Sequence, residues 1–122
     1  MHYAAREGYT RLAAIFLTSG ADVTARNIAR EIPLHLAIRA GKKAGDVSEY
    51  LIAQTPSDKI NMKDHSGQTP LHAAAEFGNS DMINKILAKN GDITIVDLHM
   101  QAALHRAASK ANREICRLLL AY

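Results

Sequence analysis

The sequence predicts an all-α fold of about four stacked helix pairs. A short phrase recurs along the chain, as "MHYAAREGY", "EIPLHLAIRAGK", "GQTPLHAAAEFGN" and "QAALHRAASKAN". Each copy holds a histidine, two small apolar residues soon after it, and Gly or Ala six residues after it. The histidines, which are 33, 37 and 33 residues apart, are His2, His35, His72 and His105. Self-similarity at such a period is typical of a solenoid of supersecondary units.

The third copy shows how a unit begins, with a turn and a short helix. Residues 64–67, Asp-His-Ser-Gly, are a turn signal, because Asp favours the first position and Gly tolerates a positive φ. Thr69 then stands where a helix N-cap belongs. Pro70 follows at the first helical position, where its missing N–H costs nothing. We expect the helix that starts at Pro70 to end at Gly78.

A second, longer helix follows in each unit and carries one apolar stripe. In the third unit it is expected to begin near Asn79 or Ser80 and to end at Asn90-Gly91. Apolar residues at i, i+1, i+4 and i+5 lie on one side of a helix, and stacked neighbours can bury a stripe that one pair cannot. The predicted stripes are Leu12, Ala13, Phe16 and Leu17; Val47, Leu51 and Ile52; Met82, Ile83, Ile86 and Leu87; and Ile115, Cys116, Leu119 and Leu120.

The spacing of 37 residues is explained by insertions in the second unit. Its stripe is shifted by two residues relative to the other units, which places two extra residues in "GKKAGD", before the second helix. Two more must lie in "QTPSDK", after that helix. Both segments are expected to be loops, where changes of length are tolerated.

These motifs resemble the ankyrin-repeat family, most closely in "DHSGQTPLHAAAEFGN", "NGDITI" and "SGADVTA". The resemblance covers essentially the whole chain and implies a single ankyrin-repeat solenoid, with β-turns projecting from helix-turn-helix units. The approximate units are 1–26, 27–63, 64–96 and 97–122. The first begins at its helix and the last stops inside its second helix. We therefore expect either a fragment of a longer array or a minimal protein with improvised ends.

Three kinds of position depart from the family pattern. Arg30 and Met100 occupy the place of the turn glycine, which costs about 1 kcal/mol each if φ is positive there. Ile32 and Ala102 replace the capping threonine, and Ala103 replaces the proline. These irregularities indicate a natural sequence rather than an idealised design.

Composition limits the class of partner and the cellular compartment that we expect for this protein. A net charge of +3 over 122 residues requires neither a nucleic acid nor an anionic membrane as partner. The single Cys116 suits a reducing compartment, so we expect an intracellular protein, cytoplasmic or nuclear. The apolar run "LAAIFL" has only six residues, and Glu7 interrupts the basic segment before it. We expect neither a secretion signal nor membrane insertion.

Catalytic and metal-binding classes find little support in the residues. Packed helices stand about 8–10 Å apart, whereas a metal ion needs its nitrogen ligands about 2 Å away, so the repeated histidines cannot share one ion. The resemblance instead implies that each histidine hydrogen-bonds within its turn and to the neighbouring repeat. Cys116 lies on a buried stripe, and no phosphate-binding loop or hydrolase motif occurs. We expect no enzyme activity, cofactor or small-molecule substrate.

Nucleic-acid binding is also not expected. It requires a dense basic stripe with interleaved aromatic residues. Arg6 and Arg39 occupy equivalent positions at the ends of first helices, but Glu76 and Ser109 stand there in the other two units.

The resemblance implies that a partner protein binds at the turns and at the inner, first-helix face. The turn candidates are Ile28, His65, Gln68, Leu98, His99 and Gln101, and the first-helix candidates are Arg6, Arg39, Glu76, Phe77 and Lys110. Ile28, Phe77 and Leu98 are large apolar residues where the scaffold does not need them. They either contact a partner or pack against neighbouring turns or further repeats.

The expected function is non-covalent binding of another protein. The alternative is that these repeats are a regulatory or assembly segment of a larger protein, such as a channel, a kinase or an inhibitor.

Overall fold

A computed structural model describes residues 1–77, 80–110 and 112–121. The predicted helix boundaries at Gly78 and Asn79 lie outside the described residues. The α-helices are α1 His2–Glu7, α2 Thr10–Thr18, α3 Pro33–Arg39, α4 Gly45–Gln54, α5 Pro70–Phe77, α6 Ser80–Ala88, α7 Ala103–Ser109 and α8 Arg113–Leu120. Two short 3-10 helices, η1 Gly41–Ala44 and η2 Ser57–Lys59, stand before and after α4.

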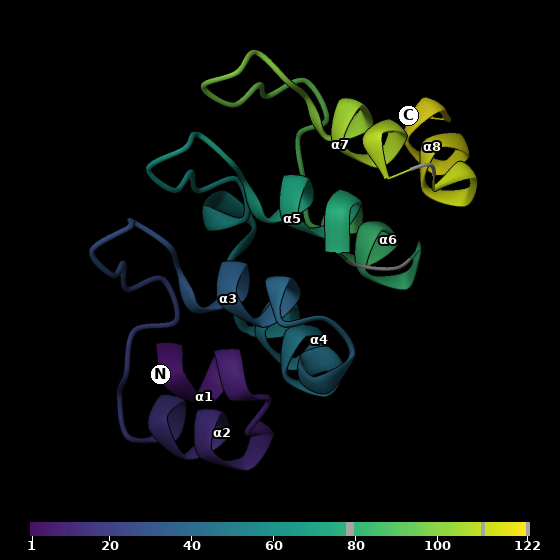
Figure 1. The fold of residues 1–122 in the computed structure, drawn as a ribbon. Helices are drawn as coiled ribbons and strands as arrows, with labels where there is room; N and C mark the ends of the chain where they lie inside the picture. The colour runs from purple at the N-terminus through teal and green to yellow at the C-terminus, as the bar shows by residue number, and fades with distance from the viewer. Residues whose placement is uncertain (78–79, 111, 122) are drawn as a thin grey trace.

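The helices form two stacked layers. The first helices of the pairs, α1, α3, α5 and α7, contact one another in chain order, and so do the second helices, α2, α4, α6 and α8. The chain therefore runs from α1 and α2 at one end of the stack to α7 and α8 at the other (Figure 1). The turns before α3, α5 and α7 project to the same side of the helices (Figure 1). The prediction of an all-α solenoid is confirmed.

Small residues let the first helices approach closely. The side chains of Ala4, Ala5, Ala37, Ala74 and Ala107 are completely buried between neighbouring first helices and the second layer. The second helices in the middle of the stack bury their stripes as predicted. The buried stripe residues there are Val47, Leu51 and Ile52 in α4 and Met82, Ile83, Ile86 and Leu87 in α6.

The stripes at the two ends of the stack are less complete. In α2 only Ala13 is fully buried, since α4 is the one second helix that α2 contacts among the described residues. The prediction that Leu120 belongs to the buried stripe of α8 is wrong, because Leu120 is 71% exposed. Leu118 packs against the core instead, beside Ile115 and Leu119. Cys116 is half-buried against the same core.

The extra residues of the second unit lie where the spacing places them. "GKKAGD" contains η1, and "QTPSDK" contains η2. The loop at η1 also contacts the first unit. Gly8 ends α1 with a φ of 77°, and a Cβ added there would lie 2.1 Å from the carbonyl oxygen of Lys43. Only glycine fits both the backbone conformation and the contact.

The three projecting turns share one geometry. In each, the first residue and the last are joined by a backbone hydrogen bond of 2.9–3.0 Å across residues 27–31, 64–68 and 97–101. The fourth residue is left-handed, with a φ of 62° at Arg30, 77° at Gly67 and 60° at Met100. Arg30 and Met100, which stand at the position of the turn glycine, thus have the positive φ that is costly for a residue other than glycine.

The turns also pair with one another along the stack. The N–H of His65 donates to the carbonyl oxygen of Ala29 at 2.9 Å, and the N–H of Leu98 donates to that of Ser66 at 2.9 Å. These bonds place the turns edge to edge in one continuous row.

In the described residues, no helix is long and apolar enough to cross a membrane.

Candidate interaction face

The candidate site is the inner face, which we define as the row of turns together with the C-terminal ends of the first helices. Its predicted contact residues are Ile28, His65, Gln68, Leu98, His99, Gln101, Arg6, Arg39, Glu76, Phe77 and Lys110. Its shape depends on how rigidly the turns are attached to the helices below them.

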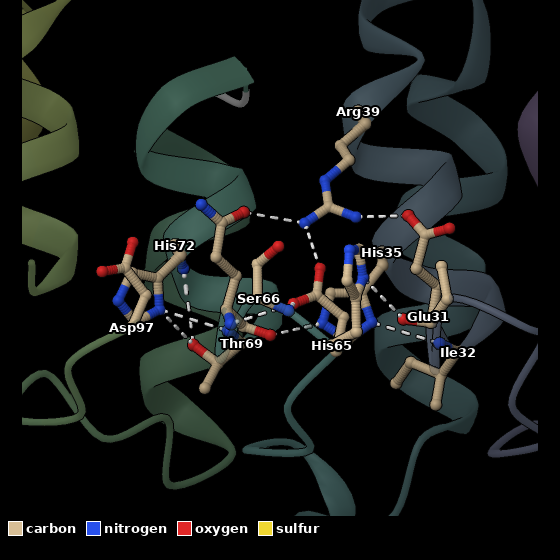
Figure 2. A network of polar contacts seen from close by, with 12 residues as sticks. Glu31, Ile32, His35, Arg39, His65, Ser66, Thr69, His72 and Asp97 are labelled. Atoms are coloured by element: carbon tan, nitrogen blue, oxygen red, sulfur yellow. Dashed lines mark hydrogen bonds and ion pairs between the residues drawn. The ribbon is translucent and has the colours of Figure 1, made fainter. Parts of the chain in front are cut away.

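The repeated histidines make that attachment. The Nδ1 atom of His35 accepts the N–H of Ile32 at 3.2 Å, so the proton of the neutral ring is on Nε2. Nε2 then donates to the carbonyl oxygen of Gln68 at 2.9 Å, in the following turn. His72 repeats the pattern. Its Nδ1 atom accepts the N–H of Thr69 at 3.2 Å (Figure 2), and its Nε2 atom lies 2.9 Å from the carbonyl oxygen of Gln101.

His2 makes a bond of the same kind, and we call the bonds from His2, His35 and His72 to the turns that follow them the histidine ladder. The Nε2 atom of His2 lies 2.8 Å from the carbonyl oxygen of Glu31. The two bonds that the family resemblance implies for the repeated histidine, within its own turn and to the next repeat, are therefore both present at His35 and His72, and His2 makes the second of them. In the described residues, no cluster of three or more His, Cys, Asp or Glu residues is arranged to hold a metal ion.

Burial keeps His35 neutral. It lowers the pKa of His35 from 6.5 to about 4, and the nearby charge of Arg39 acts in the same direction. The hydrogen bond to Gln68 opposes the shift but does not cancel it. Burial also lowers the pKa of His72. His35 and His72 are therefore neutral imidazoles near neutral pH.

Arg39 forms a polar network at the centre of the inner face. Its guanidinium pairs with the carboxylate of Glu31 at the end of the preceding turn. The same group donates to Oδ2 of Asp64 at 2.6 Å and to Oε1 of Gln68 at 2.8 Å, both in the following turn (Figure 2). Only 23% of the Arg39 side chain is exposed. Its charge is therefore used inside the molecule, where it ties two turns to α3.

The aspartates that open the last two turns have two roles each. Oδ1 of Asp64 accepts the N–H groups of Ser66 and Gln68, and Oδ2 pairs with Arg39. Burial alone would raise the pKa of the Asp64 carboxyl, but the bonds from Arg39 and the turn outweigh it, and the pKa is lowered. Asp97 caps its turn similarly and pairs with Arg106 of α7, at 2.7 Å. Sequence reasoning identified Asp64 as a turn former but missed both ion pairs.

The three apolar candidates are separated rather than clustered. Ile28 is fully exposed and Leu98 is 73% exposed, on turns with the turn 64–68 between them. Neither side chain is therefore buried to any large extent by the neighbouring turns. Phe77 is 45% exposed at the other end of α5, where Nζ of Lys110 lies 5.8 Å from the centre of its ring. Lys110 also pairs with Glu76 at 3.6 Å.

The remaining candidates surround these side chains. His65 and His99 are exposed on their turns, whereas Gln68 and Gln101 are half-buried because their carbonyl oxygens receive the histidine ladder. Arg6 is exposed on α1. An open depression of about 540 Å³ lies at the turn tips and is lined by Asn27, Ile28, Ala29 and His65.

Comparisons with known proteins agree with this architecture. A family model described as "Ankyrin repeats (3 copies)" matches residues 1–97 and 44–122. The chain is 34% identical over 120 residues to neurogenic locus notch homolog protein 2 of Homo sapiens and 31% identical over 120 residues to notch homolog protein 1 of the same species. It is 28% identical over 123 residues to transient receptor potential cation channel subfamily A member 1 of Drosophila melanogaster.

These alignments cover nearly all of this chain and little of the relatives. Each includes 98% of this chain, but only 5% of either notch protein and 10% of the channel subunit. The chain thus spans a small part of the length of the curated relatives it matches.

Proposed function

Because the chain belongs to the ankyrin-repeat family, whose repeats are protein-interaction modules, we propose that it binds a partner protein non-covalently through the inner face. The proposal rests mainly on Ile28 and Leu98. They are large apolar side chains in the row of turns that remain exposed although the turns around them are tightly paired. Exposed apolar side chains flanked by polar ones are typical of contact surfaces.

The surrounding structure supports a face that is formed before binding. The histidine ladder and the Arg39 network hold each turn to the helix before it, so few backbone torsions remain to be ordered when a partner docks. A preorganised surface loses less conformational entropy on association. In this proposal Ile28, Leu98 and Phe77 are the anchors, and Arg39 mainly supports the face from within.

The finer features of the proposal follow the same reasoning. The chain acts as a binding module without chemistry of its own, and it works in an intracellular compartment, which the single Cys116 suits.

The alternative, a regulatory or assembly segment of a larger protein, is favoured by one observation. The matched relatives are ten to twenty times longer than the aligned region, since that region is 5–10% of their length.

Affinity capture from cell lysate with paired variants tests the anchors. The first variant carries Ile28→Ser and Leu98→Ser, on the turns, and the second carries Phe77→Ala. The control carries Ile15→Ser and Leu120→Ser, which remove two exposed apolar side chains of the same types from the second-helix layer. Circular dichroism establishes that all the proteins are folded.

The expected result is a protein that the parent and the control capture and that the turn variant loses. Capture of the same protein by the turn variant and by Phe77→Ala would contradict the inner-face proposal. Loss of that protein with the control alone would move the docking surface to the second-helix layer.

A further inference from the structure

A second surface lies beside the row of turns, on the segments that lead into them. It is a groove of about 490 Å³ lined by Arg26, Arg30, Asn61, Met62, Lys63, Asp64, His65, Gly67 and Leu98. A volume of this size is comparable to that of pockets that hold drug-sized ligands. His65 and Leu98 are also predicted contact residues of the inner face. Of the groove's three cationic residues, Arg26 and Lys63 lie just before the turns, and Arg30 lies in the turn 27–31 but is not among the predicted contact residues.

The groove carries an uncompensated positive charge. Arg26, Arg30 and Lys63 are all exposed, and none of them forms an ion pair with any residue that the structure describes. Among the described residues that line the groove, Asp64 carries the one carboxylate, and it is already paired with Arg39 and hydrogen-bonded to its own turn. Three cations gathered in a hollow therefore attract an anionic ligand.

The apolar part of the lining limits what that ligand can be. Met62 is half-buried at the base of the turn, and Leu98 is largely exposed at the far side of the groove. The positive positions do not continue to the third turn, where Val96 and Met100 stand in the places of Lys63 and Gly67. A nucleic acid would require a longer basic stripe with several phosphate contacts. A short ligand with both negative and apolar groups fits better.

We propose that this groove docks a short acidic segment of a partner protein. Its carboxylates lie against Arg26, Arg30 and Lys63, and one apolar side chain lies against Met62 and Leu98. The groove would favour partners with negatively charged segments, whereas the uncharged apolar anchors of the inner face do not discriminate by charge. A partner that reaches both surfaces would be bound by the turns from two sides.

Fluorescence anisotropy with defined peptides tests this groove. The probe is a labelled eight-residue peptide with one leucine among glutamates, and the matched probes replace the glutamates by glutamines or the leucine by alanine. The groove variant is Arg26→Gln, Arg30→Gln, Lys63→Gln. The control variant, Arg11→Gln, Arg113→Gln, Arg117→Gln, removes the same charge from exposed positions on α2 and α8.

The parent is expected to bind the glutamate peptide more tightly than either matched probe, and added salt should weaken that binding. The groove variant should bind it about tenfold more weakly, while the control changes by less than twofold. Circular dichroism verifies the fold of each protein. Phe77→Ala should leave peptide binding unchanged, so the result is independent of whether Phe77 anchors a partner.

Several outcomes would overturn the proposal. They are no binding of the glutamate peptide by the folded parent, equal binding of the glutamine peptide, or equal losses in the two charge variants. Oligothymidylate of twelve nucleotides and vesicles of phosphatidylcholine with phosphatidylserine serve as competing ligands. If either binds more tightly than the peptide and is lost with the groove variant, the groove has a different occupant.

Discussion

A single buried histidine fixes both the start of a helix and its link to the next turn. In His35 the two functions use the two ring nitrogens, so the ring must stay neutral for both bonds to exist. A protonated ring would direct a second N–H at the N–H of Ile32. The pKa of about 4 in the folded state, against 6.5 in the unfolded chain, makes the stability depend on pH.

The first prediction concerns that dependence. Because the folded pKa is lowered, the unfolded chain binds more protons between pH 6.5 and 4. The contribution of His35 is therefore complete above pH 6.5 and is lost as the pH falls towards 4. Urea denaturation at pH 7 and pH 5 should show His35 contributing a loss of about 2 kcal/mol in the free energy of unfolding.

A variant separates this effect from the general effect of acid. His35→Gln should be less stable than the parent at pH 7, and its loss between pH 7 and pH 5 should be clearly smaller than that of the parent. His99→Gln removes an exposed histidine and should keep the loss of the parent. Equal losses in the parent and His35→Gln would contradict the assignment.

At the scale of single residues, backbone conformation could be predicted from the sequence better than side-chain contacts could. The left-handed backbone at Arg30 and Met100 could be predicted, because it depends only on their place in a local turn. The partners of Arg39 could not be predicted, since Glu31, Asp64 and Gln68 are 8, 25 and 29 residues away from it. Its predicted role as a contact residue thus rested on position alone, without knowledge of the bonds that occupy its guanidinium.

At the scale of elements, adjacent second helices are joined by a lysine. Lys89 follows α6 directly, and its Nζ donates to the carbonyl oxygens of Ala53 and Thr55, at 2.7 Å each. These carbonyls lie at the C-terminal end of α4, where the helix has no internal donors for them and carries a partial negative charge. Lys89 therefore caps a helix that belongs to the preceding pair.

The second prediction compares two lysines that are one helical turn apart. Lys89→Met should lower the free energy of unfolding by about 1–2 kcal/mol, because it removes two charged hydrogen bonds from a half-buried site. Lys85→Met removes an ion pair with Glu49 at 3.2 Å, in which both side chains are about half exposed. It should cost less than about 0.5 kcal/mol. Urea titrations followed at 222 nm measure both, and equal losses would show that the capping bonds contribute little.

The elements themselves could largely be predicted from periodicity. The shift of the stripe in the second unit placed the extra residues, and η1 and η2 lie there. Leu120 was assigned wrongly because the stripe pattern assumes a neighbour on each side of every second helix. The groove at Arg26, Arg30 and Lys63 was missed, because it depends on the pairing of turns that are 37 residues apart.

At the scale of the whole molecule, stability depends on how strongly each helix pair is coupled to the next. In a solenoid each unit contacts only its neighbours, so unfolding stays cooperative while the interfaces between units are strong. Two arginines make otherwise similar ion pairs with turn aspartates. Arg39 of α3 pairs with Asp64 in the turn that precedes α5, whereas Arg106 of α7 pairs with Asp97 in the turn that precedes α7 itself. Only the first pair crosses between neighbouring units.

The third prediction uses this contrast. Arg39→Met and Arg106→Met should each lower stability by about 1–3 kcal/mol, because each leaves a buried aspartate without its ion pair. Only Arg39→Met should also weaken the cooperativity between the two halves of the stack. Its urea transition should broaden, with a lower m-value, while Arg106→Met keeps the slope of the parent. Hydrogen exchange should show α1 and α3 opening separately from α5 and α7 in the first variant alone. If both variants keep the parent's slope and exchange pattern, the histidine ladder and the apolar core couple the units without help from Arg39.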